Sequence, residues 1–279
     1  MLALGSKAGQ PCMAERLHPP ASLDPQPLTG VLVLVTRPQN QSQPVMEMLR
    51  RLGARACSQP LLDIEPAAIA DVQAIGAAVD TFDAVVFTSQ NAVAAVKAAI
   101  APGGVEPARW PTVYAVGSAT ARAAGQLAAR VEVPSGVRSA RELFSQLARR
   151  LSPGSRVWFP HGSLTPADVC DPLVRAGHTV VDTVCYRTKT IRVPPDAWRV
   201  FTDWHACLAV FLYSPSAARA FLEQAPPRLL GQCPQLVAVG ETTARACAEW
   251  GRPVDAVAPH PSDAGMVEAL VQLRAKRNG

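Results

Sequence analysis

Apolar and polar positions alternate in blocks along the chain from residue 30 onward. The first block, VLVLVT at residues 31–36, is a continuous β-branched and apolar run, which is typical of a strand buried on both faces. The segment QPVMEMLRRLG at residues 43–53 predicts an amphipathic helix that ends at Gly53. A strand followed by a helix is the building unit of α/β proteins with parallel sheets.

The same order of strand and helix returns along the rest of the chain. Further strands are expected in FDAVVFTS, TVYAVG, RVWFP, CLAVFLYS and LVAVG, at residues 82–89, 112–117, 156–160, 207–214 and 236–240. The helices expected after them span residues 91–100, 119–128, 167–177, 216–224 and 242–251. This alternation predicts an α/β fold built on parallel sheets.

The two halves of the chain repeat each other. Arg37 and His161, which both follow an expected strand, lie 124 positions apart, and Gly117 and Gly240 lie 123 positions apart. A shift this constant indicates internal duplication and two similar domains. Prolines in or beside residues 61–68 and 186–196 favour extended backbone there, so we expect two linkers at which the chain crosses between domains.

Composition narrows the class of partner. A net charge of +5 favours anionic ligands, but Lys and Arg are scattered and not interleaved with aromatic residues, so we expect no nucleic-acid partner. The seven cysteines contain no C-x-x-C pair, and the five histidines form no H-x-x-x-H pattern. We therefore expect reduced thiols, a cytoplasmic protein and no metal site.

The beginning of the chain differs from the rest. Residues 1–29 contain five prolines among small and polar residues and lack the apolar core of a signal peptide. We expect a disordered leader there, and no later segment is long enough in apolar residues to span a membrane.

Candidate ligand-binding residues follow the expected strands, because open α/β sheets bind ligands at the carboxyl ends of their strands. These positions are rich in hydroxyls, glycines and helix N-termini and poor in carboxylates, which suits an anionic ligand. The candidates are Arg37, Ser89, Asn91, Gly117, Thr120, His161, Ser214, Ser216, Gly240, Thr242 and Thr243.

Each candidate has an ordinary structural alternative. Ser, Thr and Asn before a helix are common N-caps, and Ser139 with Glu142 forms an expected capping box that needs no other role. Arg37 is either a ligand contact or a solvated charge, and His161 is either a binding or catalytic group or a hydrogen-bonded loop residue. Tyr186, beside a linker, either packs its ring on a domain edge or donates a proton to a leaving group.

Common cofactor and nucleophile motifs are absent from the sequence. There is no G-x-G-x-x-G after the first strand, no G-x-x-x-x-G-K-[ST] and no G-x-S-x-G. Nicotinamide, ATP and serine-hydrolase functions are therefore disfavoured. The expectation that remains is a cleft that binds a ligand with several negative charges and uses no cofactor.

Six motifs resemble those of uroporphyrinogen-III synthases: VLVTRP, FDAVVFTSQNAV, VYAVGSATA, TVCYRT, YSPSAARAF and VAVGETTA. The resemblance runs from Val31 to Leu273 and rests on the order and spacing of the motifs. It implies a cofactor-independent lyase whose substrate is hydroxymethylbilane, a linear tetrapyrrole. The enzyme would close that chain to uroporphyrinogen III with inversion of the terminal pyrrole ring and loss of water.

The resemblance also assigns roles to single residues. Tyr186 matches the tyrosine that is thought to help the hydroxyl of the substrate leave. The side-chain hydroxyls that match those of the family's cleft are Ser89, Thr120, Ser214 and Thr243. Thr242 is the alternative to Thr243. One departure concerns the strand that usually ends in Arg-Gly, because His161 precedes Gly162 here.

The resemblance further implies a domain arrangement. Residues 30–64 would join residues 190–279 in one domain, residues 68–186 would form the other, and a two-stranded linker would connect them beside a cleft. The protein would be a monomer, with the preceding pathway enzyme as a candidate for transient contact. The alternative function is a non-catalytic two-domain anion- or tetrapyrrole-binding protein or regulator.

Overall fold

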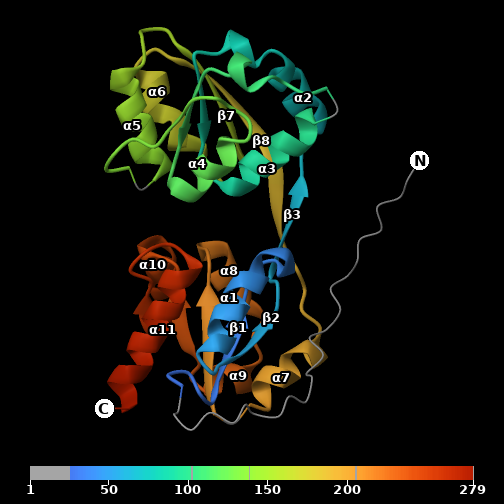
Figure 1. Cartoon of the computed structure of the whole chain (residues 1–279), viewed down its shortest axis with the longest axis vertical. Helices are drawn as coiled ribbons and strands as arrows, with labels where there is room; N and C mark the ends of the chain where they lie inside the picture. The colour runs from blue at the N-terminus through green and yellow to red at the C-terminus, as the bar shows by residue number, and fades with distance from the viewer. Residues whose placement is uncertain (1–25, 102, 138, 205, 279) are drawn as a thin grey trace, which may run out of the picture. The chain divides into compact units, whose positions relative to one another are not determined.

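The computed structural model describes residues 26–101, 103–137, 139–204 and 206–278, and the chain divides into two compact α/β units (Figure 1). Unit 2 is the continuous segment Ile64–Lys189. Unit 1 combines the residues up to Asp63 with those from Thr190 onward. The opening strand and helix therefore belong to the same unit as the C-terminal part of the chain.

Unit 1 is built on a parallel sheet of five strands in the order β11-β10-β9-β1-β2. The strands are β1 (Val31–Val35), β2 (Arg55–Ser58), β9 (Cys207–Leu212), β10 (Gln235–Ala238) and β11 (Ala256–Val257). Every residue of β1 is buried, as its apolar run predicts. Leu32 and Leu34 pack into the core on one face of the sheet, and Val31, Val33 and Val35 pack into the core on the other.

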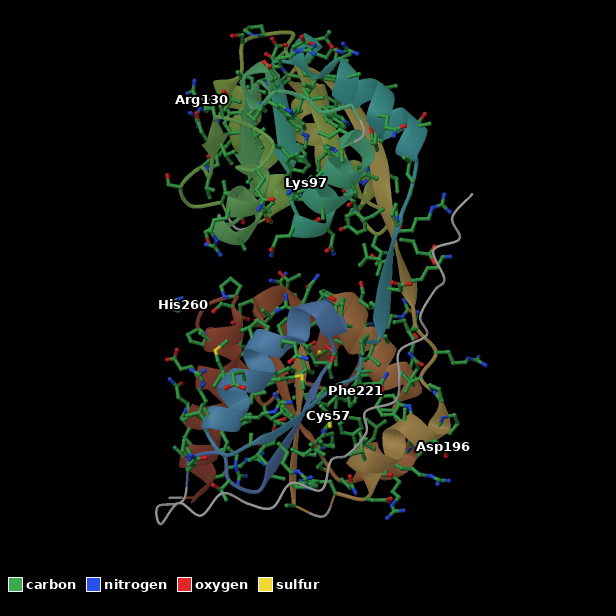
Figure 2. The ribbon with its side chains drawn as sticks, turned by 45° about the vertical axis from the view of Figure 1, so that its right-hand side comes forward. Cys57, Lys97, Arg130, Asp196, Phe221 and His260 are labelled. Carbon is green, nitrogen blue, oxygen red and sulfur yellow. The ribbon has the colours of Figure 1, made fainter. Side chains whose placement is uncertain are left out.

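Helices cover both faces of this sheet. On the face of Val33 lie α1 (Gln39–Arg51) and α11 (Asp263–Asn278), which bury Leu49 and Leu270. On the other face lie the helices α7 (Arg199–Thr202), α8 (Pro215–Gln224), α9 (Pro227–Gly231) and α10 (Glu241–Glu249), preceded by the 3-10 helix η4 (Pro195–Trp198). Figure 2 shows Phe221 of α8 and Cys57 of β2 inside this core, while Asp196 lies at the surface.

Unit 2 has a six-stranded sheet in the order β3-β8-β7-β4-β5-β6. The strands are β3 (Leu62–Pro66), β4 (Ala84–Phe87), β5 (Thr112–Ala115), β6 (Val131–Glu132), β7 (Arg156–Gly162) and β8 (Thr179–Thr190). All neighbouring pairs from β8 to β6 are parallel. One face packs against α2 (Ile69–Ala77), α3 (Gln90–Ile100) and α4 (Ser118–Ala124), and the other against α5 (Ala140–Arg150) and α6 (Asp171–Arg175).

The chain passes between the units through β3 and the end of β8, which are neighbouring strands. The Ala67 N–H donates to Cys185 O at 3.0 Å and the Ile191 N–H donates to Leu61 O at 2.9 Å, so the two strands run antiparallel. Of the linker expected over residues 186–196, β8 reaches Thr190, and the backbone at Pro194 still has the extended angles φ −59° and ψ 143°. The 3-10 helix η4 then starts at Pro195.

Two further expectations need correction. The expected leader ended at residue 29, but Leu28 is fully buried and its N–H donates to Leu52 O at 2.9 Å, so the end of that segment belongs to unit 1; residues 1–25 lie outside the described residues. The helix expected over 167–177 is divided into the 3-10 helix η3 (Ala167–Cys170) and the short α6, since Pro172 can only occupy the first turn of a helix.

The order of strands agrees with the repeat in the sequence. Reading unit 1 as β2-β1-β9-β10-β11 and unit 2 as β8-β7-β4-β5-β6 aligns β1 with β7 and β9 with β4. The helices after β1 and β9 cover opposite faces of the sheet, and so do those after β7 and β4. Each unit thus has a topological switch point, between β1 and β9 in unit 1 and between β4 and β7 in unit 2, where open α/β sheets form ligand crevices.

Candidate functional site

The switch point of unit 2 brings Tyr186 and Ser89 together. Tyr186 lies on β8, and its hydroxyl is 3.1 Å from Ser89 Oγ at the end of β4. Ser89 is also the N-cap of α3, since its Oγ accepts the N–H of Ala92 at 3.1 Å. The phenol therefore lies at the N-terminus of α3, where the field of the helix favours negative charge.

Burial controls the ionisation of this phenol. Removal from water raises the pKa of Tyr186, while the hydrogen bond with Ser89 acts in the opposite direction. Tyr186 thus stays protonated at neutral pH and retains a hydrogen-bonding partner that stabilises a phenolate. Such a group suits transient donation of a proton.

Gly162 forms the surface on which the Tyr186 ring packs. The two residues are partners in the β7–β8 register, beside an irregularity between His161 and Gly162. A Cβ atom at position 162 would lie 2.4 Å from Tyr186 Cζ and 2.6 Å from its hydroxyl oxygen. Real Cβ contacts are never this short, so the ring can occupy its position only because residue 162 has no side chain.

His161 points into unit 2. The residue is 7% exposed, and its ring stacks on Phe159 with centroids 4.7 Å apart. Its Nδ1 lies 3.0 Å from Gly162 O, and its Nε2 lies 3.3 Å from Asp182 Oδ2 on β8. The sequence left two roles open for His161, and these contacts correspond to that of a hydrogen-bonded residue. His161 lies on strand β7, however, and not in a loop.

At the switch point of unit 1, Arg37 is held by other side chains. Its Nη1 donates to Asp263 Oδ1 at 2.7 Å and its Nη2 to Gln41 Oε1 at 3.1 Å. The guanidinium also lies over the Tyr213 ring, 4.5 Å from the centroid, and the Tyr213 hydroxyl donates to the same Asp263 oxygen at 2.9 Å. Arg37 is therefore partly buried and ion-paired, and an anionic ligand would share it with Asp263.

The charge of Asp263 affects the pKa of Tyr213, and this effect can be tested by mutation. Burial raises the pKa of Tyr213 far above the usual range, and the charge and hydrogen bond of Asp263 raise it further, because a carboxylate disfavours a neighbouring phenolate. We expect Asp263→Asn to lower the pKa of Tyr213, since the amide still accepts its hydrogen bond but carries no charge. Absorbance titration of phenolate formation measures this shift, and Tyr213→Phe identifies the step.

Glu47→Gln is the matched control for that titration, because Glu47 is an exposed carboxylate paired with Arg51 elsewhere in unit 1. This variant should leave the pKa of Tyr213 as high as in the unmodified chain. An Asp263→Asn protein whose Tyr213 titrates as in the unmodified chain would contradict the assignment.

Two other helices start at glycines. α4 follows Gly117 and α10 follows Gly240, and neither N-cap makes a side-chain hydrogen bond in the described part of the chain. Their first N–H groups are therefore available to an anion. This differs from α3 and α8, which are capped by Ser89 and Ser214.

The threonines of these helix starts differ in exposure. Thr120 and Thr243, which occupy equivalent places in the repeat, are 6% and 2% exposed, so both face the core. Thr242 is exposed at the start of α10. Burial thus favours Thr242 over Thr243 as the more accessible hydroxyl, because residues that follow one another on a helix point to different sides.

The remaining candidates lie at the starts of helices α3 and α8. Ser214 Oγ accepts the N–H of Ala217 at 3.1 Å, and Asn91 and Ser216 are half-buried in the first turns of α3 and α8. Ser139 caps α5 by accepting the Glu142 N–H at 3.3 Å, as the sequence predicts.

Sequence reasoning missed three residues of these sites, namely Asp182, Tyr213 and Asp263. Tyr213 carried a signal, because it directly precedes the candidate Ser214. Asp182 and Asp263 carried none, since their contacts with His161 and Arg37 join segments 21 and 226 positions apart.

No group of three or more His, Cys, Asp or Glu residues that could hold a metal ion occurs within the described ranges. Every helix found in those ranges is too short or too polar to cross a membrane. Among the cysteines that the structure describes, Cys170, Cys185, Cys207, Cys233 and Cys247 are free thiols.

Comparisons with known proteins point to one family. The family model for uroporphyrinogen-III synthase HemD matches residues 43–268. The uroporphyrinogen-III synthase of Chlorobaculum parvum is 26% identical over 251 residues, which cover 86% of this chain and 98% of that protein.

Solved structures agree on the fold. A mutant uroporphyrinogen III synthase from Thermus thermophilus has a TM-score of 0.57 at 18% identity, covering 88% of this chain and 99% of that one. The uroporphyrinogen-III synthetase of Helicobacter pylori has a TM-score of 0.55 at 17% identity, covering 86% and 98%. Because the family model spans most of the sequence, the chain belongs to the uroporphyrinogen-III synthase family, whose members are enzymes of porphyrin biosynthesis.

Proposed function

We propose that the protein converts hydroxymethylbilane to uroporphyrinogen III, inverting the terminal pyrrole ring and releasing water. The observation that carries the proposal is the position of Tyr186, whose phenol lies at the switch point of unit 2 against Ser89 and the N-terminus of α3. Membership of the family supports the overall reaction, and this phenol supplies a group able to start it.

The proposed first step is loss of the substrate's hydroxyl. The Tyr186 O–H transfers its proton to that hydroxyl, the C–O bond breaks and water leaves, which produces an azafulvene cation and a phenolate. Burial keeps the phenol protonated beforehand, and Ser89 together with the α3 N-terminus stabilises the phenolate afterwards.

Ring closure then returns the proton. The cation is attacked by the substituted position of the terminal pyrrole, which gives a spiro intermediate, and rearrangement inverts that ring. Loss of a proton from the closed ring to the phenolate restores Tyr186. No electrons are gained or lost, so the proposed reaction needs no redox cofactor, and the protein's main contribution is to hold the folded substrate in place.

The carboxylates of the substrate require cationic and N–H partners. The chain has a net charge of +5, and its strand ends offer Arg37 and the uncapped starts of α4 and α10. We propose these groups as carboxylate contacts, together with the exposed Thr242. We further propose a cytoplasmic monomer, in keeping with the free thiols of Cys185 and Cys247.

The experiment is incubation of the purified protein with freshly prepared hydroxymethylbilane, followed by oxidation and separation of the uroporphyrin isomers. Isomer III is expected in excess of isomer I, the spontaneous product, which a protein-free control measures. Formation of isomer I alone would exclude the proposed reaction. If the bilane also bound without turnover, the result would instead support the non-catalytic binding protein.

A further inference from the structure

We infer that Arg37 carries a carboxylate subsite on the edge formed by its Nε and Nη2 atoms, and that Gln41 is the side chain that a bound carboxylate displaces. The inference rests on the proposed function, in which Arg37 holds a carboxylate of the substrate. It goes further by naming the edge of the guanidinium that does so and by giving Gln41 a role in specificity.

The two sides of the Arg37 guanidinium have different partners. Nη1 donates to Asp263 Oδ1 at 2.7 Å, so one side of the group is ion-paired. On the edge that Nε and Nη2 share, Nη2 donates to the neutral Gln41 Oε1 at 3.1 Å. The Nε atom is buried and has no hydrogen-bond partner within the described ranges. One N–H of this edge therefore lacks the acceptor that a buried donor requires.

Other arginines of the chain show what completes such an edge. Arg109 donates from Nε and Nη2 to Asp80 Oδ2 at 3.2 and 2.6 Å. Arg130 donates from the same two atoms to Glu132 Oε1 at 3.0 and 2.8 Å. In both cases the acceptor is a carboxylate, whose charge strengthens the hydrogen bonds. At Arg37 a neutral amide oxygen takes this place and satisfies only one of the two nitrogens.

The guanidinium is held in place independently of Gln41. It lies over the Tyr213 ring, 4.5 Å from the centroid, and the Tyr213 hydroxyl donates to Asp263 at 2.9 Å. The Arg37 carbonyl oxygen accepts the hydroxyl of Ser42 at 3.1 Å, and Ser42 is fully buried. Displacement of Gln41 thus leaves the arginine in position, and an incoming carboxylate meets a preorganised partner.

Gln41 can leave this edge at little cost. The residue is exposed in the first turn of α1, and within the described ranges its side chain hydrogen-bonds only with Arg37. The first turn of α1 contains no acidic residue, so the field of the helix favours a carboxylate there. A bound carboxylate therefore replaces one neutral contact with a charge-assisted pair, while water solvates the released amide.

Binding of uroporphyrin III, a fluorescent polycarboxylate, tests the subsite without relying on turnover. Gln41→Glu places a carboxylate of the chain itself on the edge, so we expect the Kd of uroporphyrin III to rise about tenfold. Gln43→Glu is the matched control, because Gln43 is exposed on the same helix and the substitution changes the net charge equally. This control should alter the Kd by less than about twofold, since an exposed charge is screened by salt.

A second pair of variants tests whether Gln41 acts through Arg37. Gln41→Ala removes the competing oxygen and should lower the Kd about two- to threefold. Arg37→Lys keeps a positive charge beside Asp263 but has no Nε–H, so Gln41→Ala should give no gain in that background. Urea unfolding verifies that the lysine variant is folded. An equal gain in both backgrounds would show that the edge of Arg37 is not the group that Gln41 covers.

The outcomes separate the subsite from the proposed function. Equal Kd values for Gln41→Glu and Gln43→Glu, or no binding of uroporphyrin III to the unmodified chain, would overturn the subsite whether or not isomer III is formed. If Gln41→Glu alone weakens binding but no isomer III forms, the catalytic function fails and the subsite stands. If both hold, Gln41→Glu should raise KM for the bilane about tenfold with little change in kcat, because the contact exists before and during the reaction.

Discussion

Replacing Tyr186 by Phe is expected to lower kcat for isomer III by about 10²- to 10⁴-fold, the range typical for loss of a general acid. KM should change much less, because the ring atoms that pack on Gly162 are retained and only the hydroxyl is removed. Initial rates over a range of bilane concentrations separate the two constants.

Tyr114→Phe is the matched control for this experiment. Tyr114 is a buried tyrosine of β5 in the same unit, and burial raises its pKa as well. Removing the hydroxyl of Tyr114 should leave kcat nearly unchanged. A Tyr186→Phe protein with an unchanged rate would remove Tyr186 from the mechanism.

Gly162→Ala is the second change with a large expected effect. The new methyl group would overlap Tyr186 Cζ, Cε2 and hydroxyl, all within 2.6 Å, so the ring must leave its position and lose Ser89. We expect the free energy of unfolding to fall by about 1–3 kcal/mol, the usual cost of overpacking. The rate of isomer III formation should fall together with it, because the phenol is displaced.

A double-mutant cycle tests the cause of this effect. In a Tyr186→Ala background the ring is absent, so Gly162→Ala should cost much less stability, as measured by urea unfolding. Gly103→Ala is the control, because a Cβ atom there meets nothing within 4 Å. Equal losses in both backgrounds would show that Tyr186 is not the group that excludes a side chain at position 162.

Much of the fold could be predicted because parallel strands buried on both faces leave continuous apolar runs. The strands β1, β4, β9 and β10 coincide with such runs, and α8 and α10 begin within one residue of their expected starts. The edge strands β6 and β11 contain two residues each, too few for a pattern. The helix expected to reach residue 128 ends at Ala124, because Gly125 and the residues after it leave the helix.

The candidate sites were harder to predict, because their contacts are long-range. Tyr186 and Ser89 were both named from the sequence, yet their mutual hydrogen bond joins residues 97 positions apart. The need for glycine at position 162 has no local cause, since it arises from a ring on the neighbouring strand. Arg37 was expected either to contact a ligand or to be solvated, whereas Asp263, a distant residue, holds it in an ion pair.

The discontinuous course of unit 1 determines the order in which a growing chain can fold. Unit 2 is one uninterrupted segment and can form as soon as residue 189 is available. The interior strand β1 must wait for the central strand β9, which begins 176 positions later, where Val31 pairs with Cys207. Until then VLVLV presents apolar side chains on both faces without its central partner. Unit 1 is consequently completed last, and during synthesis β1 is the segment most prone to aggregate.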